Sequence, residues 1–216
     1  MEIIFTLFLG LHILGGSIGL ITGTINVIRE KGNKIHKSIG KLFLYGMLNA
    51  GISALILSLL HTNYFLFIVG VFTIYMVGTG QRYIIHKFQD SREVEITDWL
   101  LTAVMLLFGL AFIVYGVYLL ITGQTFGTVF LVFGFLSLRF VQTDFKNYKG
   151  SSVDKNYWQL GHLQRMTGGY IAALTAFLVV NINYLPATLP AIIVWLLPTI
   201  IFTPLIIRWS RKYKSK

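Results

Sequence analysis

The chain has 216 residues, of which 55% are hydrophobic and only 12% are charged. A soluble protein has about 25% charged residues. The absence of cysteine disfavours a disulfide-stabilised secreted scaffold. The formal net charge of +10 does not indicate a nucleic-acid partner, because the basic residues lie in short segments between long apolar runs, where they set membrane topology. Composition therefore indicates an integral membrane protein rather than a soluble enzyme or a nucleic-acid-binding domain.

Four long stretches contain no charged residue, and their lengths predict the number of membrane spans. The first has 26 residues, and the other three have 40, 40 and 42. Because a helix needs about 20 residues to cross a hydrocarbon layer about 30 Å thick, they predict one span followed by three helical hairpins. The stretches are 3–28, 42–81, 99–138 and 166–207.

The expected fold is therefore an all-α, polytopic transmembrane helix bundle that forms one integral membrane domain over residues 1–216. All 18 Lys and Arg residues lie in the connections of one side and in the C-terminal tail, and none lies in the turns of the other side. The positive-inside rule then predicts an N-terminus outside and a cytoplasmic C-terminus. The seven predicted spans are 3–28, 39–60, 64–85, 98–122, 126–141, 160–182 and 187–208.

Small and polar residues recur at helical spacing in four of these spans, and in lipid such residues mark the face turned into the bundle. In the first span they align with His12, at about 100° per residue. We interpret most of these positions as packing positions. The expected inward-facing residues are Gly16, Gly19, Gly23, Asn49, Tyr75 and Gly169.

His12 is the most deeply placed ionisable residue of the predicted spans. A charged group at the centre of a span costs about 2.5 to 3.5 kcal/mol, so an ionisable residue there is a candidate functional residue. One interpretation is a neutral imidazole that is hydrogen-bonded at its own depth, for example to 49–51 or Tyr75. The others are a proton relay in a proton-coupled carrier and a cofactor ligand.

A second group of polar residues comes from different cytoplasmic ends of the spans, so folding could bring them to one level. Lysine and arginine there could bind anionic lipid headgroups. The alternative without a function is a set of solvated interfacial residues that share no site. The candidate ligand-binding residues, with His12, are His36, His162, Arg82, Arg139, Asp144 and Arg165.

Two cofactor hypotheses use the histidines of this group. One is a single b-type haem held by His36 with His162 or His86, with arginines near the propionates. No span carries two histidines at the spacing that would serve a haem near each face, so two haems are disfavoured. The other is a metal site for hydrolysis built from His36, His86 and His162, although no H-x-x-x-H or H-E-x-x-H pair is present.

A resemblance to a known family rests on three elements of the sequence. These are His12, residues 36–41 with the sequence HKSIGK, and His162 with Arg165 and Met166. The chain resembles an uncharacterised family of bacterial multi-pass membrane proteins, a domain of unknown function, with an H-[KR]-x-x-G-[KR] element entering the second span. The resemblance implies that His12, His36 and His162 are the functional histidines, and it does not include His61 or His86. It also implies the bacterial inner (plasma) membrane as the location.

The function expected from the sequence is non-enzymatic. A seven-span inner-membrane protein would bind a small membrane-associated ligand or a partner at an inward His/Arg site. An anionic lipid, a quinone or haem would each satisfy the positive first turn of the second span. The alternatives are a single b-type haem protein in membrane electron transfer and a proton-coupled carrier.

Overall fold

The computed structural model describes residues 2–88, 94–151, 154–186 and 188–214, with the side chains of 86–88 excepted. Within these residues the chain is all-helical, and seven helices are long and apolar enough to cross a membrane, which confirms the predicted all-α class and the predicted number of long apolar helices. These are α1 (Glu2–Ile28), α2 (Lys34–Leu60), α3 (Tyr64–Phe88), α4 (Ile96–Ile121), α5 (Gly127–Tyr148), α6 (Tyr157–Val180) and α7 (Ala191–Tyr213), with a short 3-10 helix η1 (Ile182–Tyr184) before α7.

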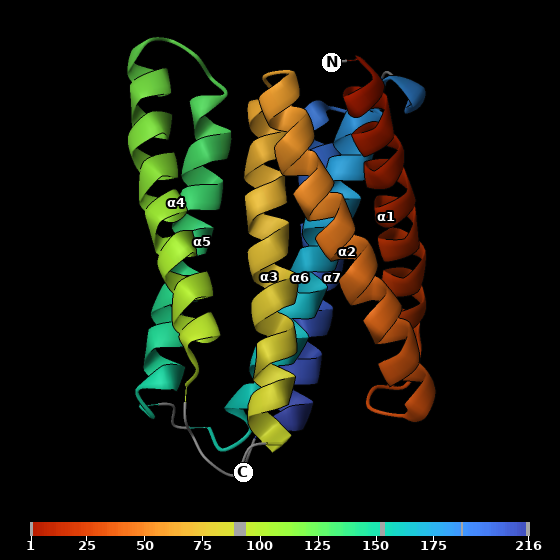
Figure 1. Ribbon diagram of the computed structural model, residues 1–216, viewed down its shortest axis with the longest axis vertical. Helices are drawn as coiled ribbons and strands as arrows, with labels where there is room; N and C mark the ends of the chain where they lie inside the picture. The colour runs from red at the N-terminus through yellow and green to blue at the C-terminus, as the bar shows by residue number, and fades with distance from the viewer. Residues whose placement is uncertain (1, 89–93, 152–153, 187, 215–216) are drawn as a thin grey trace.

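Successive helices run in opposite directions, so the N-terminus and the C-terminus lie at opposite ends of the bundle (Figure 1). The predicted hairpins are present as the packed pairs α2–α3, α4–α5 and α6–α7, and α1 packs mainly on α2. The structure adds a close pairing of α3 with α6, which the order of the hairpins does not predict. Because α3 also contacts α4 and α5, it joins the α4–α5 hairpin to the other helices.

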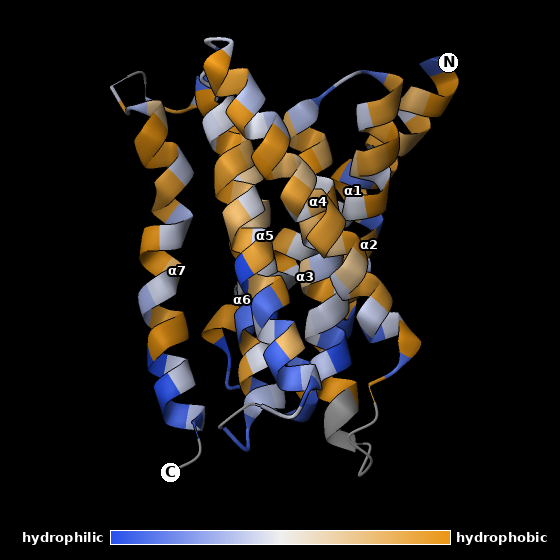
Figure 2. Ribbon diagram, turned by 90° about the vertical axis from the view of Figure 1, so that its left-hand side faces the viewer, coloured by the Kyte–Doolittle hydropathy of each residue, from blue (hydrophilic) through white to orange (hydrophobic). Residues whose placement is uncertain are grey.

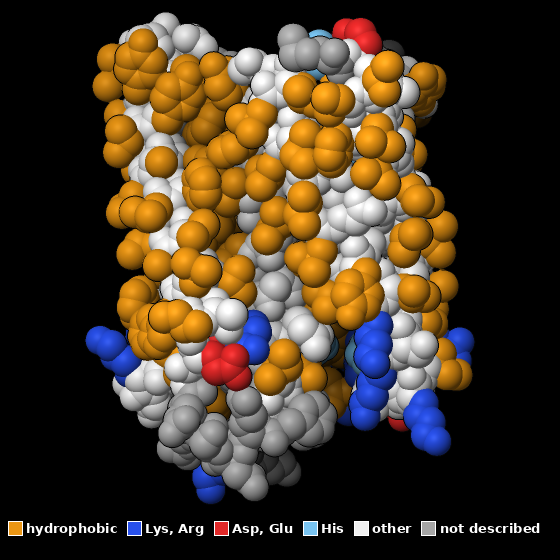
Figure 3. Space-filling model, viewed as in Figure 1, with side chains coloured by type: hydrophobic (Ala, Val, Ile, Leu, Met, Phe, Trp, Pro, Cys, Tyr) orange, Lys and Arg blue, Asp and Glu red, His pale blue; other side chains and the backbone are white. Residues whose placement is uncertain are grey.

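Hydrophilic residues gather at the end of the bundle where the C-terminus lies, below a broad apolar surface (Figure 2). On the face shown in Figure 3, most Lys and Arg side chains lie at this same end. We call it the basic end; it contains the α1–α2 and α5–α6 connections and the end of α7.

The helices extend further at the basic end than the predicted spans. α2 begins at Lys34 rather than 39, α5 continues to Tyr148 rather than 141, and α7 continues to Tyr213 rather than 208. The prediction ended each span near the first charged residue, but a helix can continue beyond the hydrocarbon layer into water. At the start of α2, the side chain of Asn33 accepts a hydrogen bond from the backbone N–H of His36 (2.8 Å), which is an N-cap.

α1 approaches α2 through glycines that lie one helical turn apart. A Cβ atom on Gly15 would lie 2.7 Å from the carbonyl oxygen of Gly46, and one on Gly19 would lie 2.3 Å from Sδ of Met47. Gly16 was expected on this inward face, and the structure corrects that prediction. A Cβ atom there would meet nothing within 4 Å, because Gly16 is rotated by about 100° from the contact line.

The other expected inward positions lie at helix contacts or next to them. A Cβ atom on Gly23 would lie 2.4 Å from the ring of Tyr170, and one on Gly169 would lie 3.3 Å from Val77. Asn49 is half-buried and accepts a hydrogen bond from Ser53 Oγ (3.0 Å). Tyr75 is buried and belongs to the polar network that is described below.

The neighbouring glycines Gly15 and Gly16 form a matched pair for a test of the α1–α2 contact. Gly15→Ala should destabilise the protein by about 1 to 3 kcal/mol, because the new methyl group meets backbone atoms of α2 that cannot rotate away. Gly16→Ala has open space and should be neutral or slightly stabilising. Thermal unfolding in detergent measures both variants, and equal melting temperatures would contradict the close approach.

Candidate functional site

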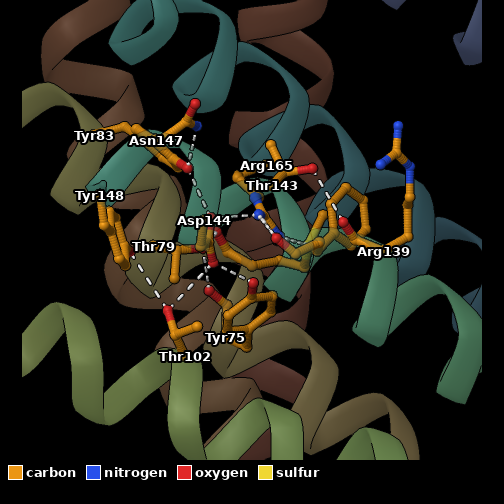
Figure 4. A network of polar contacts seen from close by, with 12 residues as sticks. Tyr75, Thr79, Tyr83, Thr102, Arg139, Thr143, Asp144, Asn147, Tyr148 and Arg165 are labelled. Atoms are coloured by element: carbon orange, nitrogen blue, oxygen red, sulfur yellow. Dashed lines mark hydrogen bonds and ion pairs between the residues drawn. The ribbon is translucent and has the colours of Figure 1, made fainter. Parts of the chain in front are cut away.

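The basic half of the bundle contains a buried ion pair between α5 and α6. Asp144 is fully buried, Arg165 is 2% exposed, and Nη2 of Arg165 lies 2.6 Å from Oδ1 of Asp144. Two phenols of α3 also donate to this carboxylate: Tyr83 to Oδ1 (2.7 Å) and Tyr75 to Oδ2. Thr102 of α4 donates a longer hydrogen bond to Oδ2 (3.4 Å). A single carboxylate thus connects four helices (Figure 4).

The polar groups around this ion pair also form hydrogen bonds. Nη2 of Arg165 also donates to the backbone carbonyl of Phe140 (2.9 Å), and the guanidinium lies 4.2 Å from the Phe140 ring centroid. The Asn147 side chain donates to the hydroxyl of Tyr83 (2.8 Å). A buried ion pair stabilises only when its remaining polar atoms are hydrogen-bonded, and that condition is met here. Both oxygens of the carboxylate are engaged by groups of the bundle, so the arrangement connects helices.

Arg82 belongs to a separate ionic cluster between α3 and the start of α4. Its guanidinium contacts both oxygens of Asp98, at 2.7 and 2.9 Å, and Oε2 of Glu95 at 2.9 Å. Asp98 is fully buried, and with Glu95 it forms a capping box on the first turn of α4. Arg82 therefore attaches α4 to α3 and is engaged away from the histidines.

A cavity of about 480 Å³ opens at the basic end among α1, α2, α3, α6 and α7. Its volume is within the range of about 300 to 1,000 Å³ that is usual for small-molecule sites. None of the described residues that line it is acidic. Its lining is basic and aromatic in character and includes Lys37, Lys41, His36, His162, Trp158 and Trp209.

His36 and His162 come from helices far apart in sequence and line this same cavity. Nδ1 of His162 lies 2.9 Å from the backbone carbonyl of Gly80 on α3. Nδ1 of His36 is buried and has no hydrogen-bond partner among the described residues, and the same holds for Oδ1 of Asn26, a residue that also lines the cavity. Neither of these two atoms has surface that a water-sized group can reach, so they lie behind the cavity wall.

Lys31 closes the cavity where α1 ends. Its ammonium group donates to the carbonyl oxygens of Asn26 (2.6 Å), Val27 (2.7 Å) and Arg29 (3.2 Å) and lies 4.3 Å from the ring centroid of Trp209. Burial lowers the pKa of the Lys31 ammonium group below its ordinary value. Because its hydrogen-bond donors cap α1, Lys31 forms part of the cavity wall. The lysines that can interact with an anionic ligand are Lys37 and Lys41, at the rim of the cavity.

The structure thus divides the expected ligand-binding set. His36 and His162 line the cavity, whereas Asp144 and Arg165 form the buried ion pair. Arg139, expected in the same site, joins neither. It is exposed, donates to Gln142 on its own helix (2.6 Å) and points away from the network in Figure 4.

His12 lies apart from both assemblies, and its Nδ1 is 2.9 Å from the carbonyl oxygen of Ala50 on α2. The partner lies within residues 49–51, where the hydrogen-bonded interpretation expected it, and the proton-coupled carrier stays a prediction. The side chain of His86 lies outside the described residues. Among those that are described, no group of three or more His, Cys, Asp or Glu residues could hold a metal ion.

Several residues of these assemblies were not predicted from the sequence. Tyr83 is one, although the spacing of Tyr75, Thr79 and Tyr83 at i, i+4 and i+8 places them along one side of a helix and could have indicated it. Asn26 and Lys31 were likewise not among the candidate ligand-binding residues.

No family model, curated protein or solved structure matches this chain. The likeness of His12, His36 and His162 to the uncharacterised bacterial family therefore stays a prediction.

A double-mutant cycle tests the buried ion pair. Asp144→Asn keeps an acceptor for the tyrosines but leaves the Arg165 charge uncompensated, so we expect a loss of about 3 to 5 kcal/mol. Adding Arg165→Met should recover part of this loss, because the uncompensated charge is removed. Glu95→Gln serves as the control and should cost less than about 1 kcal/mol, because Glu95 is 43% exposed. Melting in detergent compares Asp144→Asn, Arg165→Met, the double variant and the control. A double variant whose loss equals the sum of the two single losses would show that the charges are not coupled.

Proposed function

We propose that this chain is a multi-pass membrane protein, without enzymatic activity, that binds a small anionic membrane-associated ligand in the cavity at its basic end. The observation that carries this proposal is the composition of the cavity. Three lysines and two histidines line it together with aromatic side chains, and no described acidic residue does. A lipid phosphate at the membrane boundary fits this lining, since each nearby lysine attracts an anionic lipid by about 1 kcal/mol.

We further propose that the basic end faces the cytoplasm of a bacterial cell and that the protein lies in the inner membrane. The bias of Lys and Arg toward one end of the bundle supports this orientation. Green fluorescent protein fused after Lys216 should fluoresce, because it folds in the cytoplasm but not after export in an unfolded state. If that fusion is not fluorescent, and an enzyme that is active only after export is active when fused at the same position, the orientation is the opposite of the one proposed.

Binding can be measured by native mass spectrometry of the detergent-solubilised protein with two lipids of identical acyl chains. Phosphatidylmethanol carries the phosphate charge and no further polar headgroup, and phosphatidylcholine has no net charge. The protein should prefer phosphatidylmethanol. Lys37→Ala with Lys41→Ala should reduce that preference about tenfold or more, since about 1 kcal/mol is lost for each lysine.

The matched control removes two exposed lysines of the basic end that do not line the cavity. Lys146→Ala with Lys149→Ala lowers the net charge by the same amount and should leave the preference unchanged. An equal fall in both double variants would show a general attraction of lipid to the basic end, and the cavity would have no part in it.

A b-type haem is the second candidate, because His36 and His162 line one cavity. The Nδ1 atom of His162 is held by a backbone carbonyl, which is the usual support for an imidazole that binds iron through Nε2. The same preparations decide between the candidates. Haem would give a Soret absorption band that His36→Ala or His162→Ala abolishes, and a colourless protein after expression with sufficient haem excludes it.

A further inference from the structure

The polar atoms inside the cavity narrow the class of anionic ligand, and this inference rests on the proposed function. His162 gives one constraint. Because the carbonyl of Gly80 can only accept, Nδ1 of His162 carries the hydrogen atom of that contact. The neutral ring then has a lone pair on Nε2, which no described residue engages. His162 therefore offers the cavity an acceptor.

Two other polar atoms of the lining residues do not face the cavity. Oδ1 of Asn26 and Nδ1 of His36 are fully buried, with no surface that a water-sized group can reach, so a ligand in the cavity does not contact them. Nε2 of His162 is not enclosed in this way. A ligand that supplies hydroxyl donors therefore gains a hydrogen bond at Nε2 of His162.

Phosphate oxygens cannot supply those donors, because they are acceptors themselves. The cations that match a phosphate lie elsewhere in the lining, at the exposed Lys37 and Lys41. A quinol would offer a hydroxyl donor to Nε2 of His162 but would leave the lysines without an anion. The ligand that satisfies both parts carries a phosphate and, beside it, free hydroxyl groups.

We propose that the cavity binds a polyol phosphodiester headgroup, such as that of phosphatidylglycerol, with a hydroxyl group donating to Nε2 of His162 and its phosphate beside Lys37 and Lys41. Residues of α2 and α6 then contribute to one site. Recognition of the hydroxyls distinguishes this ligand from other anionic lipids of the same charge.

The test compares phosphatidylglycerol with phosphatidylmethanol of the same acyl chains, because both are phosphodiesters with one negative charge and only the first has free hydroxyls. In native mass spectrometry the protein should bind phosphatidylglycerol about threefold to tenfold more tightly, as expected for one added hydrogen bond. Equal binding of the two lipids, both above phosphatidylcholine, would overturn the polyol inference and leave the proposed function intact. Binding of neither above phosphatidylcholine would overturn the proposed function as well.

Two substitutions of His162 test the roles of its two ring nitrogens separately. In His162→Asn the amide nitrogen can replace Nδ1 and donate to Gly80, but nothing replaces Nε2, so the preference for phosphatidylglycerol should fall to about one- to twofold. In His162→Gln the longer amide reaches the position of Nε2 and can accept, so most of the preference should persist. The opposite order of the two variants would reject the role of Nε2.

Two soluble competitors complete the test. Glycerol 3-phosphate should displace phosphatidylglycerol only at far higher concentration, and equal potency would show that the ligand is a free polyol phosphate rather than a lipid. A short-chain ubiquinol should not displace the lipid from the protein. Displacement by ubiquinol that Lys37→Ala with Lys41→Ala leaves unchanged would overturn the proposal in favour of a quinol site.

Discussion

A carboxylate in the interior of an apolar helix bundle is stable only if a cation and several hydrogen-bond donors surround it. Asp144 meets this requirement with Arg165, two phenols of α3 and a hydroxyl of α4. Because these groups come from different helices, all of them must lie at one depth and face one point. The carboxylate therefore fixes how far α3, α5 and α6 slide and rotate relative to one another. The positions of the cavity residues on α3 and α6 follow from this constraint.

The α3–α6 pair forms a wall with different chemistry on its two sides. A Cβ atom on Gly161 would lie 2.7 Å from the ring of Tyr83, and one on Gly80 would lie 3.0 Å from Cβ of Arg165, so only glycine permits this approach. The same closeness lets His162 reach the carbonyl of Gly80. On each of these helices one face carries residues of the ion-pair network and another face lines the cavity.

The ion pair and the cavity also differ in how many of their hydrogen-bond donors and acceptors have partners within the protein. The ion pair uses its donors and acceptors within the protein, which suits a role in holding the bundle together. The cavity instead combines lysines at its rim with an acceptor, Nε2 of His162, that no described residue engages. These groups can interact with a ligand, whereas those of the ion pair interact with one another. This difference is the reason for assigning binding to the cavity.

The sequence by itself determined the all-helical class, the number of long apolar helices and the end at which the basic residues gather, because hydrophobic length and charge position are properties of contiguous segments. Only the tertiary structure decided which helix faces meet. It placed Gly15 rather than Gly16 against α2, left Arg139 exposed, and separated Asp144 and Arg165 from the histidines. A rotation of about 100° between adjacent residues decides such contacts. That rotation depends on the pairing of α3 with α6, which joins segments far apart in the chain and leaves no local pattern in the sequence.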